Sequence, residues 1–476
     1  MFVSVESGMA RPVRSRSALL LSPAYRFKVG GFSMKKFPCL LLLFTCVAFA
    51  VRAADDEAVQ SWLDPVSGHR VVQFPRTWID PDTGHRVKQL SVEPGSACLY
   101  FTQYAFTAGG TQMVMTTPHG LDLVTLATGE IEHVFQGHDA RALQTGRKTG
   151  AIFYLQAGFL YAYDPVTKQS RQLVKVPEHG SLSSINSDET LAVGSITVGG
   201  ERRELGQRRP PQPQGGYQPG DGIQLGDIAP TKHAQMDKRF DAHLPMIMFT
   251  VNLQTGEYKE LLHANDWIDH FQFSPTDPLE LMFAHEGRQW RLDRVWLIKA
   301  DGHSQPTLVH QRTMRMEIAV HEYWGSDGQW IWYDLQKPLS EDLWVGGYNP
   351  YTGQRTWYHL PPNHWSVHYN TSPDGKLFSG DGSDPIGTDE LAMAENAKWM
   401  FLFRPELIPN MPDETPNQAN MIQAGKFTAE RLVNLSEHDY SIEPNGQFTP
   451  DGKWLVFRSN MHGPIQVYAV EVAKAK

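Results

Sequence analysis

The sequence predicts an all-β fold of repeated four-stranded antiparallel units, and three observations support this. Strand-forming and turn-forming residues are both abundant, with 13 Trp, 23 Phe and 16 Tyr beside 40 Gly and 32 Pro. A phrase made of a strand, a tight turn and a second strand recurs seven times. A second hairpin phrase lies between several of the copies. Two hairpins make a four-stranded blade, so seven repeats predict a seven-bladed β-propeller. Two β-sandwiches with accidental internal similarity are the alternative.

The first phrase defines the inner hairpin of each predicted blade, and apolar residues alternate after its turn as in a half-buried strand. Its copies are FTAGGTQMVM from 106, LQTGRKTGAIFY from 143, INSDETLAVG from 185, FSPTDPLELMF from 273, WGSDGQWIWY from 324, TSPDGKLFSG from 371 and FTPDGKWLVF from 448. The outer hairpins read DLVTLATGEIEHVF, YDPVTKQSRQLV, VNLQTGEYKELL and YNPYTGQRTWYHL. The similar segments GHRVVQ from 68 and GHRVKQL from 84 are interpreted as a repeated hairpin edge, with a strand that closes the ring.

The N-terminal residues are expected to lie outside the propeller. From Met34 the chain reads MKKFPCLLLLFTCVAFAVRA, which has the charged start, apolar centre and small-residue cleavage site of a signal peptide at 34–53. Residues 1–33 are interpreted as a non-structural upstream extension. Residues 54–476 then form a single propeller domain, located in the periplasm or secreted. A Pro-, Gly- and Arg-rich insertion around 200–238 is either a flap over the substrate or a disordered surface segment.

The charge and the cysteines of the chain exclude some partners. Residues 1–53 hold eight Lys or Arg and one Glu, so their removal from 43 basic and 52 acidic residues leaves 35 and 51, a formal charge of −16. This balance argues against nucleic acid, and an anionic substrate would need a local cluster of Arg, His or metal. Cys98 alone remains after removal of the signal peptide, so we expect no internal disulfide and no thiolate metal site. We expect a monomer without a membrane span.

Polar residues recur at one position of the predicted inner strands. His321 and His368 each precede the Asp of an Asp-Gly turn by six residues, and Asn445 stands at the same offset in the last repeat. Counted from the looser turns, His270 and Gln103 take the equivalent place. Because side chains alternate along a strand, equal offsets point the same way, and we expect these five residues to converge on the central channel.

This group of side chains has the composition of a metal site. Glu443, two residues before Asn445, shares the same strand face. Imidazole, carboxylate and amide groups together suit a hard or borderline divalent ion such as manganese, calcium or zinc. For any single histidine, a water-filled channel lined by polar residues remains the alternative.

Four phrases, in their order along the chain, resemble the oligogalacturonate lyases of polysaccharide lyase family 22. They are FAHEGRQWRLDRVWLI, VHEYWGSDG, HYNTSPDGKLFSGDGSD and FTPDGKWLVFRSNMHG. The resemblance covers most of the mature chain and is sharpest from about residue 270 to the end. It implies a seven-bladed propeller that cleaves short pectin-derived uronides by β-elimination with the help of a divalent metal.

The resemblance also implies roles for single residues. His321 matches the catalytic histidine of the family, Arg294 its assisting arginine, and His368 one of its metal ligands. The family's other ligands stand in a Gln-x-x-His-x-His segment, which here is Tyr440-Ser-Ile-Glu443-Pro-Asn445. A carboxylate and an amide replace both histidines, which favours a hard cation bound through oxygen. We therefore expect Mn²⁺ or Ca²⁺, held by His368, Glu443 and Asn445.

Elimination from a uronide requires a base for the C5 proton and positive charge on the sugar carboxylate. We expect His321 to be the base, and Arg294 either to hold the carboxylate or to keep His321 uncharged. His285, His270 and Gln103 are candidates for contacts to the substrate. Two carboxylates that alternate away from these histidines, Glu286 and Glu322, are expected to serve packing or loop hydrogen bonds.

Two other functions remain open at this point. The chain could be a non-catalytic periplasmic binding propeller of the TolB-like kind, although such a scaffold has no need of the His321, Arg294 and His368 set. It could instead be a lyase for a different uronate glycan. The sequence does not distinguish the sugar epimer, the chain length or the position of attack.

Overall fold

A computed structural model describes residues 60–63, 70–73, 76–199, 236–383, 394, 397–411 and 421–475. These residues all belong to one compact unit, Asp56–Lys476. They are almost entirely β-structure; the exceptions are a short helix at 236–241 and two 3₁₀ turns, η2 (Gln289–Arg291) and η3 (Pro362–His364). The expected extension, 1–33, and the signal peptide, 34–53, lie outside the described residues, as do residues 200–235 of the insertion.

Four sheets each contain four antiparallel strands in consecutive chain order. The first holds β5 (Ala97–Cys98), β6 (Gln112–Thr117), β7 (Gly120–Thr125) and β8 (Ile131–Gln136). The second holds β9 (Arg141–Thr145), β10 (Ile152–Gln156), β11 (Phe159–Asp164) and β12 (Gln169–Lys175). The third holds β13 (Gly180–Ile185), β14 (Leu191–Thr197), β15 (Met246–Asn252) and β16 (Tyr258–Ala264). The fourth holds β17 (Ile268–Phe273), β18 (Glu280–His285), β19 (Val295–Lys299) and β20 (Thr307–Leu308).

An eight-stranded sheet follows, made of two antiparallel sets of four strands. One set is β21 (Ile318–Trp324), β22 (Ile331–Gln336), β23 (Leu343–Tyr348) and β24 (Arg355–Leu360). The other is β25 (Asn370–Thr371), β26 (Phe378–Gly380), β27 (Trp399–Leu407) and β28 (Ile422–Asn434). The outer strands β24 and β28 pair in parallel, which joins the two sets along their outer edges.

The last sheet combines the two ends of the described chain. It consists of β29 (Gln447–Phe448), β30 (Trp454–Ser459), β31 (Gln466–Lys474), β4 (His85–Gln89) and β3 (Thr77–Ile79). The antiparallel pairing of β31 with β4 confirms that the segment GHRVKQL supplies a closing strand. The earlier copy GHRVVQ does not share this role, because β2 (Arg70–Gln73) pairs with β1 (Gln60–Leu63) in a separate two-stranded sheet.

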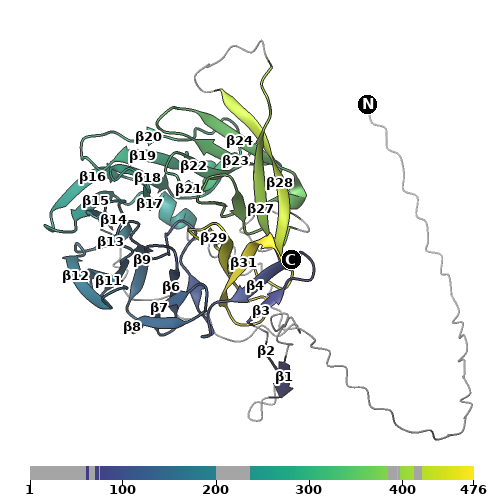
Figure 1. Cartoon of the computed structure of the whole chain (residues 1–476). Coiled ribbons are helices and arrows are strands. Elements are labelled where there is room, and N and C mark those ends of the chain that lie inside the picture. Colours follow the sequence, from purple (N-terminus) through teal and green to yellow (C-terminus); the bar gives the residue numbers. More distant parts are fainter. Residues whose placement is uncertain are drawn as a thin grey trace, which may run out of the picture. The chain divides into compact units, whose positions relative to one another are not determined.

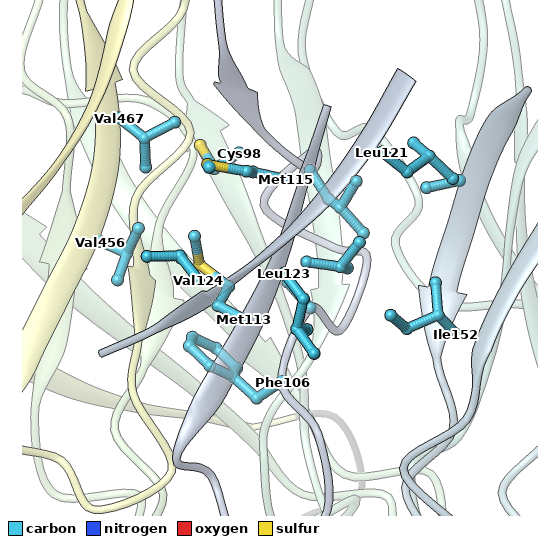
Figure 2. Close-up of a cluster of buried hydrophobic side chains, with 14 of the residues drawn as sticks. Cys98, Phe106, Met113, Met115, Leu121, Leu123, Val124, Ile152, Val456 and Val467 are labelled. Atoms are coloured by element: carbon cyan, nitrogen blue, oxygen red, sulfur yellow. The ribbon is translucent and has the colours of Figure 1, made fainter. Parts of the chain in front are cut away.

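Within this unit, successive sheets are arranged around a common centre (Figure 1), with β9, β13, β17, β21 and β29 on the inner side of their sheets. Apolar side chains fill the space between neighbouring sheets. Figure 2 shows Phe106, Met113 and Met115 of the first sheet region between Val456 of the last sheet and Ile152 of the second. Each such buried side chain contributes about 1.5–3 kcal/mol of hydrophobic free energy. The core therefore consists of apolar layers between the sheets. The side chains that face the common centre are not part of these layers and can be polar.

The insertion begins and ends in the third sheet, between β14 and β15. Its described end, the helix at 236–241, contacts the loop that follows β18: Arg291 lies 2.8 Å from Asp241 and stacks its guanidinium over Phe240. The insertion is thereby anchored beside residues 286–294, which belong to the site described below. Among the described residues, no helix combines the length and apolar character needed to cross a membrane.

Candidate active site

Four polar residues on or just before the inner strands share an uncommon backbone conformation. His270, His321, His368 and Asn445 have positive φ angles of 53°, 51°, 50° and 56°. Histidine and asparagine tolerate this conformation better than most residues. The strand register shifts at the histidines of β17 and β21, where a bulge redirects the side chain. The equal offset in the sequence thus corresponds to equal local structure, whereas Gln103 is not among the described residues with positive φ.

A buried carboxylate holds the ring of His321. Nδ1 of His321 lies 2.6 Å from Oδ2 of Asp334, which stands on β22 and is fully buried. Burial, together with the charges of Asp381 and Glu322, raises the pKa of Asp334 well above its usual value. The His321 ring also lies against the ring of His368, with centroids 4.3 Å apart. The imidazoles of His321 and His368, which come from neighbouring sets of strands, therefore lie side by side in the site.

His368 has the same kind of support but a more enclosed position, with 3% of its side chain exposed. Its Nδ1 lies 3.1 Å from Oδ2 of Asp381. Its Nε2 is buried and has no hydrogen-bond partner among the described residues, and Oε2 of Glu443 lies 3.9 Å away. Burial alone would lower the pKa of His368, but the negative charges of Asp381 and Glu443 outweigh it and raise the pKa. The unpartnered nitrogen thus lies in a negatively charged environment.

Asn445 and Glu443 connect these histidines to the last sheet. The backbone N–H of Asn445 donates to Oδ2 of Asp381 at 3.1 Å. The Asn445 side chain accepts from the N–H of Phe101 at 3.4 Å and donates to the carbonyl of Glu443 at 3.1 Å. Nε of Arg458 donates to the same carbonyl at 2.7 Å. The backbone of Glu443 is therefore fixed, while its carboxylate, 42% exposed, reaches the solvent side of His368.

Arg294, directly before β19, lies between two buried carboxylates. Its Nη1 is 2.7 Å from Oε1 of Glu286, and its Nε and Nη2 donate to Glu322 at 2.8 and 3.3 Å. Burial would lower the pKa of Arg294, but the charges of Glu286 and Glu322 raise it. These contacts use three of the five guanidinium N–H groups, so within the described structure two can still donate to a substrate. Glu286 makes one of the expected loop hydrogen bonds, to the N–H of Gly287 at 3.3 Å, but both Glu286 and Glu322 also hold Arg294, a role that was not expected.

His270 extends this charged network. Its Nε2 lies 2.9 Å from Oε1 of Glu286, and 34% of its side chain is exposed. Burial would lower the pKa of His270, but the hydrogen bond and charge of Glu286 raise it to about 9. Burial would raise the pKa of Glu286, whereas Arg294 and His270 lower it to about 2. At neutral pH the site therefore contains an imidazolium and a guanidinium linked by one carboxylate.

Tyr100, between β5 and β6, reaches the same space from a distant part of the chain. Its ring centroid lies 5.9 Å from that of His368 and 6.2 Å from that of His270. Burial and the charges of Glu443 and Glu322 raise the pKa of Tyr100 well above its usual value, so the hydroxyl stays protonated at neutral pH. The sequence pattern did not single out this residue, since it stands outside the repeated offset.

Two residues predicted to bind substrate lie apart from these contacts. The side-chain oxygen of Gln103 accepts the backbone N–H of Tyr100 at 3.2 Å and so shapes the loop. His285 packs its ring 5.5 Å from that of Trp296, its Nδ1 lies 3.9 Å from Asp266, and burial lowers its pKa. The predicted residues that the contacts do bring together are His270, Arg294, His321, His368, Glu443 and Asn445.

The two carboxylates behind the histidines were missed by sequence reasoning, although a signal for them exists. Asp334 follows His321 by 13 residues, and Asp381 follows His368 by the same number. The spacing carries the chain through the tight turn and back along the adjacent strand, which places each aspartate behind its own histidine. A search for a second repeated offset would have found both.

A cavity of about 200 Å³ lies further along the inner strands. Its lining includes Gln272, Asn370 and Gln447, each two residues after one of the positive-φ positions. Gln272 donates to the carbonyl of Glu322, Asn370 accepts from the N–H of Phe448, and Gln447 donates to the carbonyl of Tyr100. These amides link each inner strand to the next one. Because these three amide side chains hydrogen-bond to backbone groups, they have a structural role. They are distinct from the charged group formed by the histidines, Arg294 and the carboxylates.

The residues expected to bind a metal offer a small but suitable donor set. Among the described residues, no group of three or more His, Cys, Asp or Glu side chains is arranged to hold an ion. His368 and Glu443 nevertheless present an unpartnered imidazole nitrogen and a partly exposed carboxylate 3.9 Å apart. Such a pair fits a divalent cation whose remaining positions are filled by water or substrate oxygens. The Asn445 amide oxygen already accepts one backbone N–H and is a weaker addition.

The family model described as oligogalacturonate lyase matches residues 223–476, more than half of the chain. The chain belongs to the oligogalacturonate lyase family. The match contains every site residue named above except Tyr100, Phe101 and Gln103, which lie in the first sheet region. The membership agrees with the resemblance seen in the four phrases of the sequence.

Curated relatives and solved structures of the family are similar to this chain. The oligogalacturonide lyase of Pectobacterium atrosepticum is 27% identical, and the oligogalacturonate lyase of Dickeya dadantii 26% identical, each over 235 residues. Each alignment covers 47% of this chain and 55% of the relative, so the match spans about half the length of these proteins. A structure described as oligogalacturonate lyase in complex with manganese has a TM-score of 0.64 at 24% identity, covering 84% of this chain and 96% of that one. The oligogalacturonate lyase structure from Vibrio parahaemolyticus has a TM-score of 0.61 at 21% identity, with the same coverage. These two structures share the fold of this chain.

Proposed function

We propose that this protein is a lyase that cleaves uronic-acid-containing oligosaccharides, such as pectin-derived oligogalacturonides, by metal-assisted β-elimination. One observation carries the proposal: two imidazoles in contact, each held at Nδ1 by a buried carboxylate, are linked through the ring of Tyr100 to an imidazolium and a guanidinium. The network combines a base with positive charge for an acidic sugar. Membership of the oligogalacturonate lyase family supports the substrate class.

His321 accepts the C5 proton of the uronide. Its Nδ1 is committed to Asp334, so proton exchange with substrate goes through Nε2. The electron pair of the C5–H bond forms the C4–C5 double bond as the C4–O bond breaks. The departing sugar oxygen needs a proton, and Tyr100, whose ring lies against that of His368 and whose hydroxyl stays protonated at neutral pH, supplies it. The remaining N–H groups of Arg294 orient the sugar carboxylate in a bidentate fork.

His368, Glu443 and, more weakly, Asn445 would hold the divalent cation. When bound, such an ion supplies positive charge next to the sugar carboxylate and stabilises the enediolate that forms on loss of the C5 proton. Mn²⁺ is supported by the solved family structure described in complex with manganese, and Ca²⁺ by the carboxylate oxygen of Glu443. The partly exposed imidazolium of His270 is a second binding group for an acidic sugar, which supports its predicted contact with substrate.

The proposal also covers the number of blades and the compartment in which the protein acts. The eight-stranded sheet divides into two sets of four, and the last sheet adds β3 to a four-stranded set, which supports a grouping into seven blades. We propose a single seven-bladed propeller domain at 54–476. We also propose that it acts as a monomer after export to the periplasm or outside the cell; the signal-like sequence at 34–53 supports the export.

An absorbance assay tests the function directly. The mature protein is mixed with oligogalacturonides of defined length, after EDTA treatment and after addition of MnCl₂ or CaCl₂. A metal-dependent rise in the ultraviolet absorbance of a 4,5-unsaturated product is expected. Uronides of another epimer, tested in parallel, separate an oligogalacturonide lyase from a lyase for a different glycan. No product from any uronide under any metal condition would rule the proposal out.

A further inference from the structure

Two buried carboxylates hold the two central histidines in the same way. Asp334 lies on β22 and Asp381 directly after β26, and both side chains are fully buried. Each places Oδ2 within hydrogen-bond distance of an Nδ1 atom, at 2.6 Å for His321 and 3.1 Å for His368. Both pairs have the same separation of 13 residues along the chain. The arrangement is thus repeated in two neighbouring sets of strands.

Asp381 also contacts the backbone of the next positive-φ residue, because it accepts the N–H of Asn445 at 3.1 Å. The rings of His321 and His368 lie against each other, with centroids 4.3 Å apart. Contacts therefore run from His321 through His368 and Asp381 to Asn445. Asp381 fixes both the ring of His368 and the backbone of Asn445, whereas Asp334 holds the ring of His321.

The position of these contacts determines which ring nitrogen faces the substrate. A neutral imidazole carries one proton, and a carboxylate at Nδ1 favours the tautomer with that proton on Nδ1. The lone pair is then on Nε2, which is the form needed in a proton acceptor or a metal ligand. In His368 this nitrogen is the buried, unpartnered one that faces Glu443. The two rings, tilted against each other with centroids 4.3 Å apart, thereby present the same kind of atom to one space.

We propose that Asp334 and Asp381 are positioning residues that fix His321 and His368 in the tautomer with the proton on Nδ1. Asp334 prepares His321 to take up the substrate proton, and Asp381 prepares His368 to bind a metal. The effect on the reaction rests on the proposed function, whereas the tautomers themselves do not. The two consequences can therefore be tested separately.

The first experiment measures the tautomers by ¹⁵N nuclear magnetic resonance of the full mature protein with labelled histidine. Signals are assigned with His321→Gln and His368→Gln. In the wild type, at a pH where both rings are neutral, Nδ1 is expected to be protonated and Nε2 unprotonated. A ring with its proton on Nε2 would mean that the aspartate donates rather than accepts, and would overturn the proposal for that histidine. This result needs no variant of either aspartate and no activity.

The second experiment compares Asp334→Asn and Asp381→Asn with a matched control. Glu317→Gln removes another fully buried carboxylate, which holds His310 at 2.9 Å outside the site. Asp381→Asn is expected to weaken Mn²⁺ binding by about 10–100-fold in isothermal titration calorimetry, the usual effect of losing a group behind a ligand. Asp334→Asn is expected to leave Mn²⁺ affinity unchanged and to lower kcat by about 100-fold or more with little change in KM, since the wrong tautomer removes the base.

The outcomes separate three cases. Equal losses in all three variants would show a purely structural role and contradict the proposal. Asp334→Glu and Asp381→Glu retain a carboxylate, and partial recovery of kcat or of metal affinity relative to the asparagine variants is expected. A wild-type protein that has the expected tautomers and binds Mn²⁺ but cleaves no uronide would refute the proposed function and leave the positioning role in place.

Discussion

His321 and His368 are the same residue type at the same offset, and their surroundings account for their different expected roles. The side chain of His321 is 15% exposed, so a sugar ring can reach it. His368 is nearly enclosed and faces the carboxylate of Glu443, an environment that suits a cation better than a proton shuttle. One aspartate behind each ring gives both the same orientation. The difference between base and ligand thus depends on access and on one neighbouring carboxylate.

Replacement of His321 by Gln is expected to lower the rate of elimination by about 10²–10⁴-fold, the usual contribution of a positioned base. Metal affinity and melting temperature should stay close to the wild type, because the ring is not a proposed ligand. The product assay and calorimetry check this. His359→Gln is the control, since that ring is 42% exposed on β24 and pairs with Asp342 outside the site. A His321→Gln protein with wild-type rate would show that another group is the base.

Glu443→His restores an imidazole at a position where the family pattern has one. Imidazole nitrogen suits Mn²⁺ but is a poor ligand for Ca²⁺, which prefers oxygen. The variant is therefore expected to bind Ca²⁺ at least 10-fold more weakly, roughly the cost of a lost ligand group, and to keep its affinity for Mn²⁺. Calorimetry with each ion measures this, with the exposed Glu437→His as control. Unchanged Ca²⁺ affinity would remove Glu443 from the ligand set.

At the scale of elements, the sheet of β17 to β20 carries the charged part of the site. Its network runs from His270 through Glu286 to Arg294 and then to Glu322 on the next inner strand. The network therefore links two sheets through ion pairs that are largely buried. Its stability depends on the charge state of every member, which makes the sheet sensitive to pH.

The pH dependence has a defined sign. The pKa of His270 is raised from 6.5 to about 9, so its stabilising interaction is complete below pH 6.5 and is lost as the pH rises through 9. The pKa of Glu286 is lowered from 4.5 to about 2, so its contribution to the stability of the folded state is complete above pH 4.5 and is lost as the pH falls through 2. The melting temperature of the wild type should exceed that of His270→Gln at pH 6.5, and the difference should shrink towards pH 10. A constant difference would contradict the assignment.

Turns and strand alternation were predictable from sequence because they depend on local chemistry. The Asp-Gly turns place Gly328, Gly375 and Gly452 at φ angles of 67°, 68° and 68°, a conformation that glycine adopts without strain. The bulge at His321 was not predictable, since it arises from pairing with β22. At that bulge simple alternation fails. Glu322, expected to serve packing or loops, therefore reaches Arg294 of the preceding sheet.

At the scale of the whole molecule, the repeated offset predicted that distant histidines converge, and the structure brings His270, His321 and His368 into one contact network. The repeat could not predict contacts made by residues that depart from the repeated pattern. Tyr100 does not stand at the repeated offset from a turn. Asn445 stands at that offset, but its side chain hydrogen-bonds to backbone groups of Phe101 and Glu443. Family membership supports the proposed class of site. Glu443 and Asn445 stand where the resemblance implies two histidines, so the proposed ligand set is particular to this chain.

Ring closure through β4 is expected to contribute to global stability. Val87 on β4 is completely buried and packs in the same core cluster as Tyr468 and Val470 of β31. Val87→Ala should lower the free energy of unfolding by roughly 1–3 kcal/mol, the range for loss of buried methyl groups. Urea denaturation followed by tryptophan fluorescence measures the change. The exposed Val166→Ala, on the turn after β11, should have no measurable effect, and equal effects would deny β4 a closing role.

The pairing of β4 with β31 also orders events during synthesis. Residues 85–89 leave the ribosome hundreds of residues before their partner strand at 466–474 exists. Throughout most of translation the nascent polypeptide therefore has an incomplete last sheet, which can be completed only once residues 466–474 have been synthesised.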